Sequence, residues 1–122
     1  MKLLTHNILQ SNVKGVKNGY PLMLKATKIT ILDVPVNFEF IKNIMGRIDY
    51  QVLRAVAIAL GYTELPAEIP GDADTNEDFM RKLHHALQNI EVEEGELQCK
   101  ESGRVFPINN GIPNMLLHEN EV

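Results

Sequence analysis

Disulfide bonding and membrane insertion are the first possibilities that this sequence excludes. Cys99 is the only cysteine, so the chain cannot form an internal disulfide, which agrees with a reducing compartment. No apolar run approaches the roughly 18 residues needed to span a bilayer, and the amino terminus lacks the long apolar core of a signal peptide. We therefore expect a protein that works inside the cell and contacts no membrane.

Basic charge is lacking too. The formal net charge is -4, whereas a nucleic-acid-binding surface is expected to carry a basic stripe or patch. If RNA takes part in the function, we expect a partner protein to hold it, so that this chain meets RNA only indirectly.

Enzyme motifs are missing as well. No two glycines lie closer than four residues apart, whereas a doubly wound enzyme fold binds its cofactor at a Gly-rich turn after the first strand. No nucleophile motif supports a Ser-His-Asp triad. The sequence therefore predicts no catalytic residues.

The clearest positive pattern lies in the last third of the chain, from Ile90 to Leu117. Three turn signals divide it, at Glu94-Gly95, Ser102-Gly103 and Asn110-Gly111. Apolar and polar residues alternate between these turns, which is typical of half-buried antiparallel strands. Asn-Gly is the strongest short hairpin signal. We therefore predict an antiparallel meander.

The final apolar run breaks this alternation. Met115, Leu116 and Leu117 would point to both faces of a strand, so one sheet face cannot bury all three. Pro113 cannot donate a hydrogen bond to a neighbouring strand, which predicts a place at the sheet edge. An apolar edge strand is either covered within the fold or available to a partner. The partner-binding residues that we predict are Phe106, Ile108, Ile112, Pro113, Asn114, Met115, Leu116 and Leu117.

The first third of the chain predicts one further strand. Residues 1–10 suggest a short helical turn, and residues 11–21 are a loop by composition. A strand is then expected from Leu22 to Leu32. Leu22, Leu24 and Ala26 stand at even positions, whereas Ile29 and Ile31 stand at odd ones. This switch between Ala26 and Ile29 implies a bulge or a change of the element that covers the strand.

Residues 34–89 have helical periodicity. The pattern predicts a first helix near residues 38–48, a second helix capped by Asp49 and ended by Gly61, and a third helix from about Glu77 to Ile90. Thr75 or Asn76 is the expected cap of this third helix.

A length of 122 residues suits one compact unit that carries an insertion. We therefore predict an α+β fold. Residues 1–33 and 90–122 form a small antiparallel sheet domain, and residues 34–89 form an inserted three-helix subdomain.

Two places invite a metal-site interpretation that their residues do not support. Residues 72–83 begin like a calcium-binding loop, but Glu77 stands where the sharp turn needs glycine and Leu83 where a bidentate glutamate belongs. His84 and His85 are neighbours on a helix and diverge by about 100°, so they cannot converge on one ion. We expect no metal at either place.

Both ends of the chain resemble a known family. The matching residues are Met1 to Asn7, Glu94-Gly95, Leu97, Cys99, Ser102-Gly103-Arg104, Phe106-Pro107-Ile108 and Gly111 to Leu117. Together they resemble the small activator subunit shared by several S-adenosylmethionine-dependent methyltransferases. The resemblance implies a non-catalytic subunit that forms heterodimers with enzymes modifying tRNA, ribosomal RNA and a translation release factor. It also implies a zinc-ribbon-like sheet, S-adenosylmethionine bound by the partner, and a cytoplasmic and nuclear location.

Zinc itself is not expected. Cys99 to Gly103 looks like a Cys-x-x-Cys-Gly zinc knuckle in which Ser102 replaces the second cysteine. Some members of the family bind zinc with a further cysteine pair near the amino terminus, where this chain offers Ser11. A hydroxyl is a poor substitute for a thiolate in a tetrahedral zinc site. We predict the zinc-ribbon-like shape without zinc or any other cofactor, with Cys99 as a buried, small apolar residue.

Two other functions remain open on the sequence alone. The main alternative is an independent RNA-binding domain of zinc-ribbon-like shape, and the acidic net charge counts against it. A small enzyme is the third possibility, and no motif argues for it. Testing the purified chain for bound cofactor, RNA or metal would separate the three.

Overall fold

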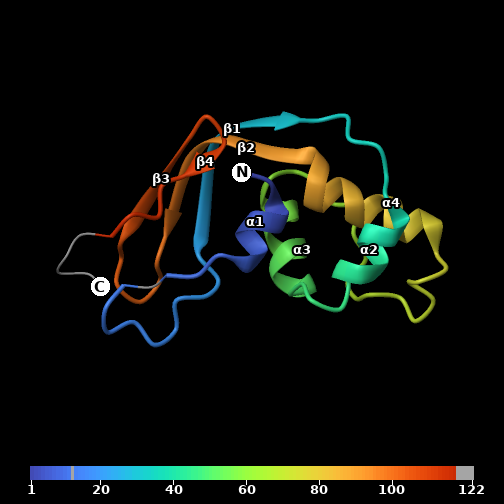
Figure 1. Ribbon diagram of the computed structural model, residues 1–122, viewed down its shortest axis with the longest axis horizontal. Helices are drawn as coiled ribbons and strands as arrows, with labels where there is room; N and C mark the ends of the chain where they lie inside the picture. Colours follow the sequence, from blue (N-terminus) through green and yellow to red (C-terminus); the bar gives the residue numbers. More distant parts are fainter. Residues whose placement is uncertain (12, 118–122) are drawn as a thin grey trace.

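The computed structural model describes residues 1–11 and 13–117. A four-stranded antiparallel sheet in the order β1-β2-β3-β4 lies at one end, and most of the helices lie at the other (Figure 1). The strands are β1 (Met23–Ile31), β2 (Ile90–Gln98), β3 (Val105–Asn109) and β4 (Ile112–Pro113). The helices are α1 (Leu3–Ile8), α2 (Phe38–Ile44), α3 (Tyr50–Ala59) and α4 (Glu77–His84), which continues as the π-helical turn η1 (His85–Asn89). The predicted α+β class is confirmed.

The predicted turn at Glu94-Gly95 is wrong, because β2 runs straight through both residues. Gly95 pairs with Ala26 on one side and with Ile108 on the other. A Cβ atom at Gly95 would collide with the carbonyl oxygen of Lys25 and lie 2.9 Å from the Cα of Ala26. Glycine is therefore needed here for the close approach of β1, and it does not reverse the chain.

The other two turn signals are confirmed. Asn110 and Gly111 have φ angles of 52° and 77° and form the two-residue connection between β3 and β4, as expected for Asn-Gly. Gly103 has a φ of 75° in the turn between β2 and β3, which the amide of Cys99 closes by donating to the carbonyl of Arg104 at 2.9 Å. β4 then lies at the sheet edge, as Pro113 indicated.

The bulge predicted in the first strand is also present. The pairing of β1 with β2 shifts register between Ala26 and Ile29. The two shifts cancel, so that Ile29 pairs with Val92 in the same register in which Ala26 pairs with Gly95. Leu24, Ala26 and Thr30 are the half-buried residues of β1, and Ile29 and Ile31 are 40 % and 56 % exposed.

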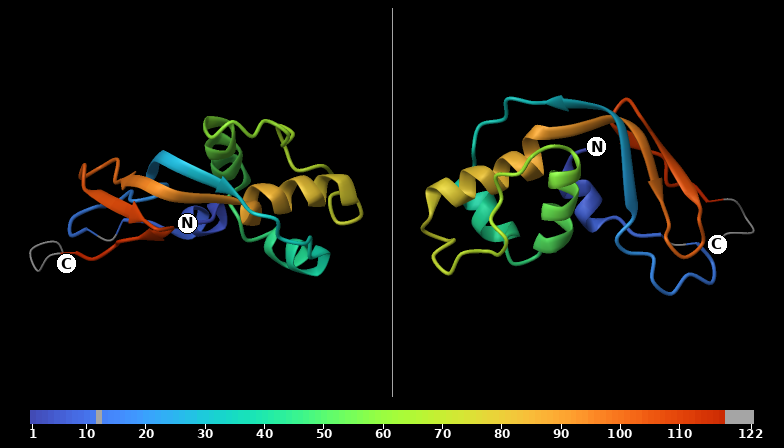
Figure 2. Two further views of the ribbon diagram at one scale, coloured as in Figure 1. Left: turned by 90° about the horizontal axis from the view of Figure 1, so that it is seen from above. Right: turned by 180° about the vertical axis from the view of Figure 1, so that it is seen from behind.

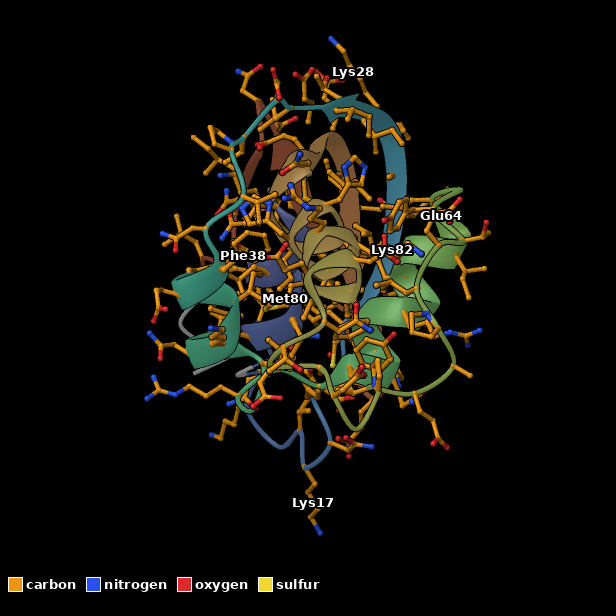
Figure 3. All side chains as sticks on the ribbon, turned by 90° about the vertical axis from the view of Figure 1, so that its right-hand side faces the viewer. Lys17, Lys28, Phe38, Glu64, Met80 and Lys82 are labelled. Atoms are coloured by element: carbon orange, nitrogen blue, oxygen red, sulfur yellow. The ribbon has the colours of Figure 1, made fainter. Side chains whose placement is uncertain are left out.

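Asparagine or aspartate side chains begin the three middle helices. Asn37, Asp49 and Asn76 accept hydrogen bonds from the backbone amides of Phe40, Val52 and Phe79, so each satisfies an amide of the first turn. The helix predicted near residues 38–48 is shorter in the structure, where α2 ends at Ile44. α2 packs on α4 (Figure 3). The guanidinium of Arg81 lies 5.2 Å from the ring centroid of Phe38.

The sheet and the helices share one cluster of buried side chains. Leu24, Leu97 and Phe106 lie opposite one another across β1, β2 and β3. Leu53 of α3 and Leu83 of α4 belong to the same buried cluster as Leu97 and Phe106. The division into a sheet domain and a separable insertion at residues 34–89 stays a prediction.

Candidate functional site

The residues that follow the Asn110-Gly111 turn form an extended segment along the free edge of β3, here named the edge segment (residues 112–117). Exposure alternates along it. Ile112 and Leu116 are 69 % and 78 % exposed, and Asn114 is exposed between them. Pro113, Met115 and Leu117 are half-buried. The edge segment therefore presents two large apolar side chains to solvent from one side.

Hydrogen bonds and a cation–π contact hold this segment in place. The amide of Asn114 donates to the carbonyl of Pro107 at 2.8 Å. Arg104 donates from Nη2 to the carbonyl of Leu116 at 3.1 Å, while its guanidinium lies 5.0 Å from the ring centroid of Phe106. Met115 and Leu117 pack against the core. The edge segment is consequently preformed, which lowers the ordering cost of any docking event.

The predicted partner-binding residues divide into two groups. Phe106 and Ile108 are 0 % and 1 % exposed, so their side chains support the edge from the interior and present no surface of their own. The other six residues form the edge segment itself. Shallow hollows border it, one of them lined by Asn109, Ile112, Pro113, Asn114, Met115 and Leu116. The sequence predicts the segment but not which side chains face outward.

A second apolar surface was missed by the sequence analysis. A groove runs between β1 and α3, and most of its lining is apolar. Its lining includes Pro21, Met23, Leu24, Val52, Ala55 and Val56. The sequence signal for this surface is the change in β1 from apolar residues at even positions to apolar residues at odd positions. This change implies that some apolar side chains of the strand lie outside the core.

Two histidines, His6 and His84, are buried. His6 is 1 % exposed and its Nε2 lies 2.7 Å from the carbonyl oxygen of Leu22. Burial lowers the pKa of His6 and also that of His84, which favours the neutral ring. Within residues 1–11 and 13–117, no group of three or more His, Cys, Asp or Glu side chains could hold a metal ion.

Cys99 is fully buried, as predicted. Burial raises the pKa of its thiol. Hydrogen bonds from the side chains of Ser102 and Ser11 and from the backbone of Ser102 and Glu101 outweigh that effect, so that the pKa falls to about 7. The helices of the described residues are all too short or too polar to cross a bilayer.

Comparisons with known proteins agree over nearly the whole chain. Residues 2–111 match the model of the Trm112p-like protein family. The chain is 48 % identical over 124 residues to the multifunctional methyltransferase subunit TRM112 homolog A of Arabidopsis thaliana, with 100 % of both chains covered. It is 47 % identical to the TRM112-like subunit of Mus musculus over 122 residues, which cover 99 % of this chain and 98 % of the relative.

A more distant relative and a solved structure extend this likeness. The TRM112 subunit of Saccharomyces cerevisiae is 33 % identical over 130 residues, with 96 % of each chain covered. A chain in the structure of the E. cuniculi Mtq2-Trm112 complex superposes with a TM-score of 0.57 over 95 % of both chains, at 22 % identity. At that identity the solved structure shows a shared fold alone. On the family model and the full-length relatives, this chain belongs to the Trm112p-like family.

Proposed function

We propose that this chain is a non-catalytic subunit that activates and stabilises S-adenosylmethionine-dependent methyltransferases acting on tRNA, ribosomal RNA and a translation release factor. Its relatives are named multifunctional methyltransferase subunits, and the complex of E. cuniculi is described as methylating the eRF1 termination factor. The single observation that carries the docking mode is the preformed edge segment, from which Ile112 and Leu116 project into solvent.

The edge segment suits addition to the sheet of a partner. An extended backbone at a sheet edge offers hydrogen bonds to another strand, and alternate side chains supply apolar contacts. Ile112 and Leu116 would each contribute about 1.5–3 kcal/mol if docking buried them fully. Pro113, Asn114, Met115 and Leu117 complete the proposed contact, with Phe106 and Ile108 behind it.

The catalytic partner gains stability by the same contact. A subunit that binds only the folded enzyme shifts the folding equilibrium of that enzyme toward the folded state. Activation then follows from a larger fraction of competent enzyme, and S-adenosylmethionine is bound by the partner. RNA meets this chain through the heterodimer.

The finer features of the fold are part of this proposal. We infer a zinc-ribbon-like shape for the sheet, without zinc, because Cys99 is the only thiol that the chain could contribute and structural zinc sites use four sulfur or nitrogen ligands. A cytoplasmic and nuclear location is proposed with the same partners, and fluorescence microscopy of the tagged protein tests it.

The experiment that tests docking replaces the two exposed side chains of the edge segment. Ile112→Asp with Leu116→Asp places charges in a contact that would lose its water, which costs several kcal/mol. Because each 1.4 kcal/mol is a factor of about ten, association with the release-factor methyltransferase should weaken at least a hundredfold. Methylation should fall in parallel, while the circular dichroism of the free subunit stays unchanged.

A matched control and a competing surface make this test specific. Ile58→Asp removes a 41 % exposed isoleucine of α3 and should leave the complex intact. Val52→Asp probes the groove between β1 and α3. If the groove variant dissociates the complex and the edge variant does not, the docking surface lies in the groove between β1 and α3, and the proposal for the edge segment is wrong.

A further inference from the structure

The strand pairing between β3 and β4 ends before the edge segment does. Its last pair joins Ile108 to Pro113. In both views of Figure 2, the end of the described chain, drawn in red, nevertheless lies beside β3, at the end of the molecule away from α2 and α4. The amide of Asn114 donates to the carbonyl of Pro107 at 2.8 Å, but proline has no N–H group with which to return the bond. Pro107 therefore interrupts the backbone pairing at this point.

Val105 and Leu116 are the next two residues that the register of β3 and β4 would bring together as a hydrogen-bonded pair. Side-chain groups bind their backbone instead. Arg104 donates from Nη1 to the carbonyl of Val105 at 2.6 Å and from Nη2 to the carbonyl of Leu116 at 3.1 Å. The amide of Leu116 donates to Oδ1 of Asn114 at 3.1 Å. One guanidinium group thus bridges a carbonyl of β3 and a carbonyl of the edge segment.

A buried aromatic ring supports this guanidinium group. The group lies 5.0 Å from the ring centroid of Phe106, which is buried and pairs with Leu97 of β2. Arginine suits this position, because its planar fork can bond two acceptors while it stacks on a ring. A hollow at the same place is lined by Arg104, Pro107, Asn114, Leu116 and Leu117. Side chains therefore span the space between β3 and the end of the edge segment.

We propose that Arg104 is a positioning residue for docking, whose guanidinium group replaces the missing backbone pair and holds residues 115–117 in the extended form that a partner strand can join. This inference rests on the proposed function, because it concerns the same edge segment, and it adds a residue that lies outside that segment. If residues 115–117 were free to move, binding would have to order them, which lowers the affinity. Arg104 therefore sets the affinity through the edge segment and not through a contact of its own with the partner.

The free subunit tests this positioning role without any partner. In Arg104→Ala, the backbone order parameters of residues 115–117, measured by NMR relaxation, should fall from about 0.85 to below about 0.6. Arg104→Lys should behave in the same way, because an ammonium group lacks the planar fork. Arg47→Ala removes an exposed arginine elsewhere and should change none of these values. Unchanged order in Arg104→Ala, or full order in Arg104→Lys, would overturn the proposal, and Arg104→Lys alone decides the matter if Arg104→Ala does not fold.

Binding to the release-factor methyltransferase tests the effect on docking. Both Arg104 variants should bind about tenfold more weakly, and calorimetry should show a less favourable entropy of binding, because residues 115–117 become ordered only in the complex. Loosened residues 115–117 with wild-type affinity would overturn the inference if Ile112→Asp with Leu116→Asp still abolishes binding. If that double variant binds as tightly as the wild type, the proposed docking mode fails, and the order parameters of the free subunit alone decide whether Arg104 positions the segment.

Discussion

The α-amino group of Met1 lies 3.0 Å from Oε1 of Glu91, and the side chain of Met1 is 0 % exposed. The α-amino group also donates a hydrogen bond to the carbonyl of Val92 at 2.7 Å, and the amide of Val92 donates back to the carbonyl of Met1 at 2.7 Å. A Cβ atom at Gly111 would lie 3.2 Å from this nitrogen. The start of the chain is therefore fixed between β2 and the turn that leads into the edge segment.

Removal of the charge on Glu91 should destabilise the fold. Glu91→Gln keeps the shape of the side chain but leaves the buried ammonium of Met1 without a counter-charge, which should lower the free energy of unfolding by about 1–3 kcal/mol. Urea denaturation measures the change. Glu68→Gln, on an exposed loop residue, is the control and should stay within about 0.5 kcal/mol of the wild type. Equal stability of the two variants would mean that the ion pair contributes nothing.

Gly95 should not tolerate a side chain. Gly95→Ala places a Cβ atom against the backbone of Lys25 and Ala26, and a paired strand cannot move away easily, so we expect a loss of about 1–3 kcal/mol. Gly46→Ala is the matched control, because nothing lies within 4 Å of a Cβ atom there, and it should be neutral or stabilise by up to about 1 kcal/mol. Thermal denaturation that ranks the two variants the other way would refute the close-approach explanation.

The thiol of Cys99 should make stability depend on pH. Its pKa is about 7 in the folded protein against 9.0 for a free thiol, so the folded state favours the thiolate. The resulting stabilisation is fully present above pH 9 and is lost as the pH falls through 7. Relative to Cys99→Ala, the free energy of unfolding of the wild type should rise by up to about 2 kcal/mol between pH 7 and 9. A flat difference between the two proteins over this interval would exclude a titrating thiolate.

The helical insertion should be removable. Ile31 pairs with Ile90, and the amide of Leu32 donates to the carbonyl of Asn89 at 2.7 Å, so the two ends that a deletion leaves are already adjacent. Joining Leu32 to Ile90 through a short Gly-Ser linker should preserve the strand signal in circular dichroism. The melting temperature should fall, because α1 contacts both α3 and η1. Complete unfolding would show that the helices are an essential part of the core.

Local signals in the sequence predict much of this fold. Asn110-Gly111 forms a turn and Asp49 caps a helix. Each depends on a few neighbouring residues alone, so the sequence is enough to predict both the turn and the start of the helix. The prediction for Gly95 is wrong because glycine serves both turns and close backbone approaches, and only the pairing with β1 distinguishes the two. The ion pair of Met1 with Glu91 joins residues 90 positions apart, and no local pattern predicts such a contact.

In the candidate site, too, local features are predictable from the sequence, whereas features that depend on the pairing of distant residues are not. The apolar run after Gly111 and the proline at position 113 are local features, and they are enough to indicate a sheet edge. The inward orientation of Phe106 and Ile108 depends on the register of β3 against β2, in which Leu97 faces Phe106. The contact of Arg104 with the carbonyl of Leu116 likewise depends on the path of the chain after the last turn.

The buried amine of Met1 has a practical consequence for the production of this protein. An affinity tag fused in front of Met1 would convert the ammonium group into a neutral amide with a single hydrogen, which cannot serve both Glu91 and Val92. Gly111 also lies close to this amine, because a Cβ atom there would come within 3.2 Å of the nitrogen. Recombinant protein for measurements of partner binding is therefore better purified with a cleavable tag that restores the free amine of Met1.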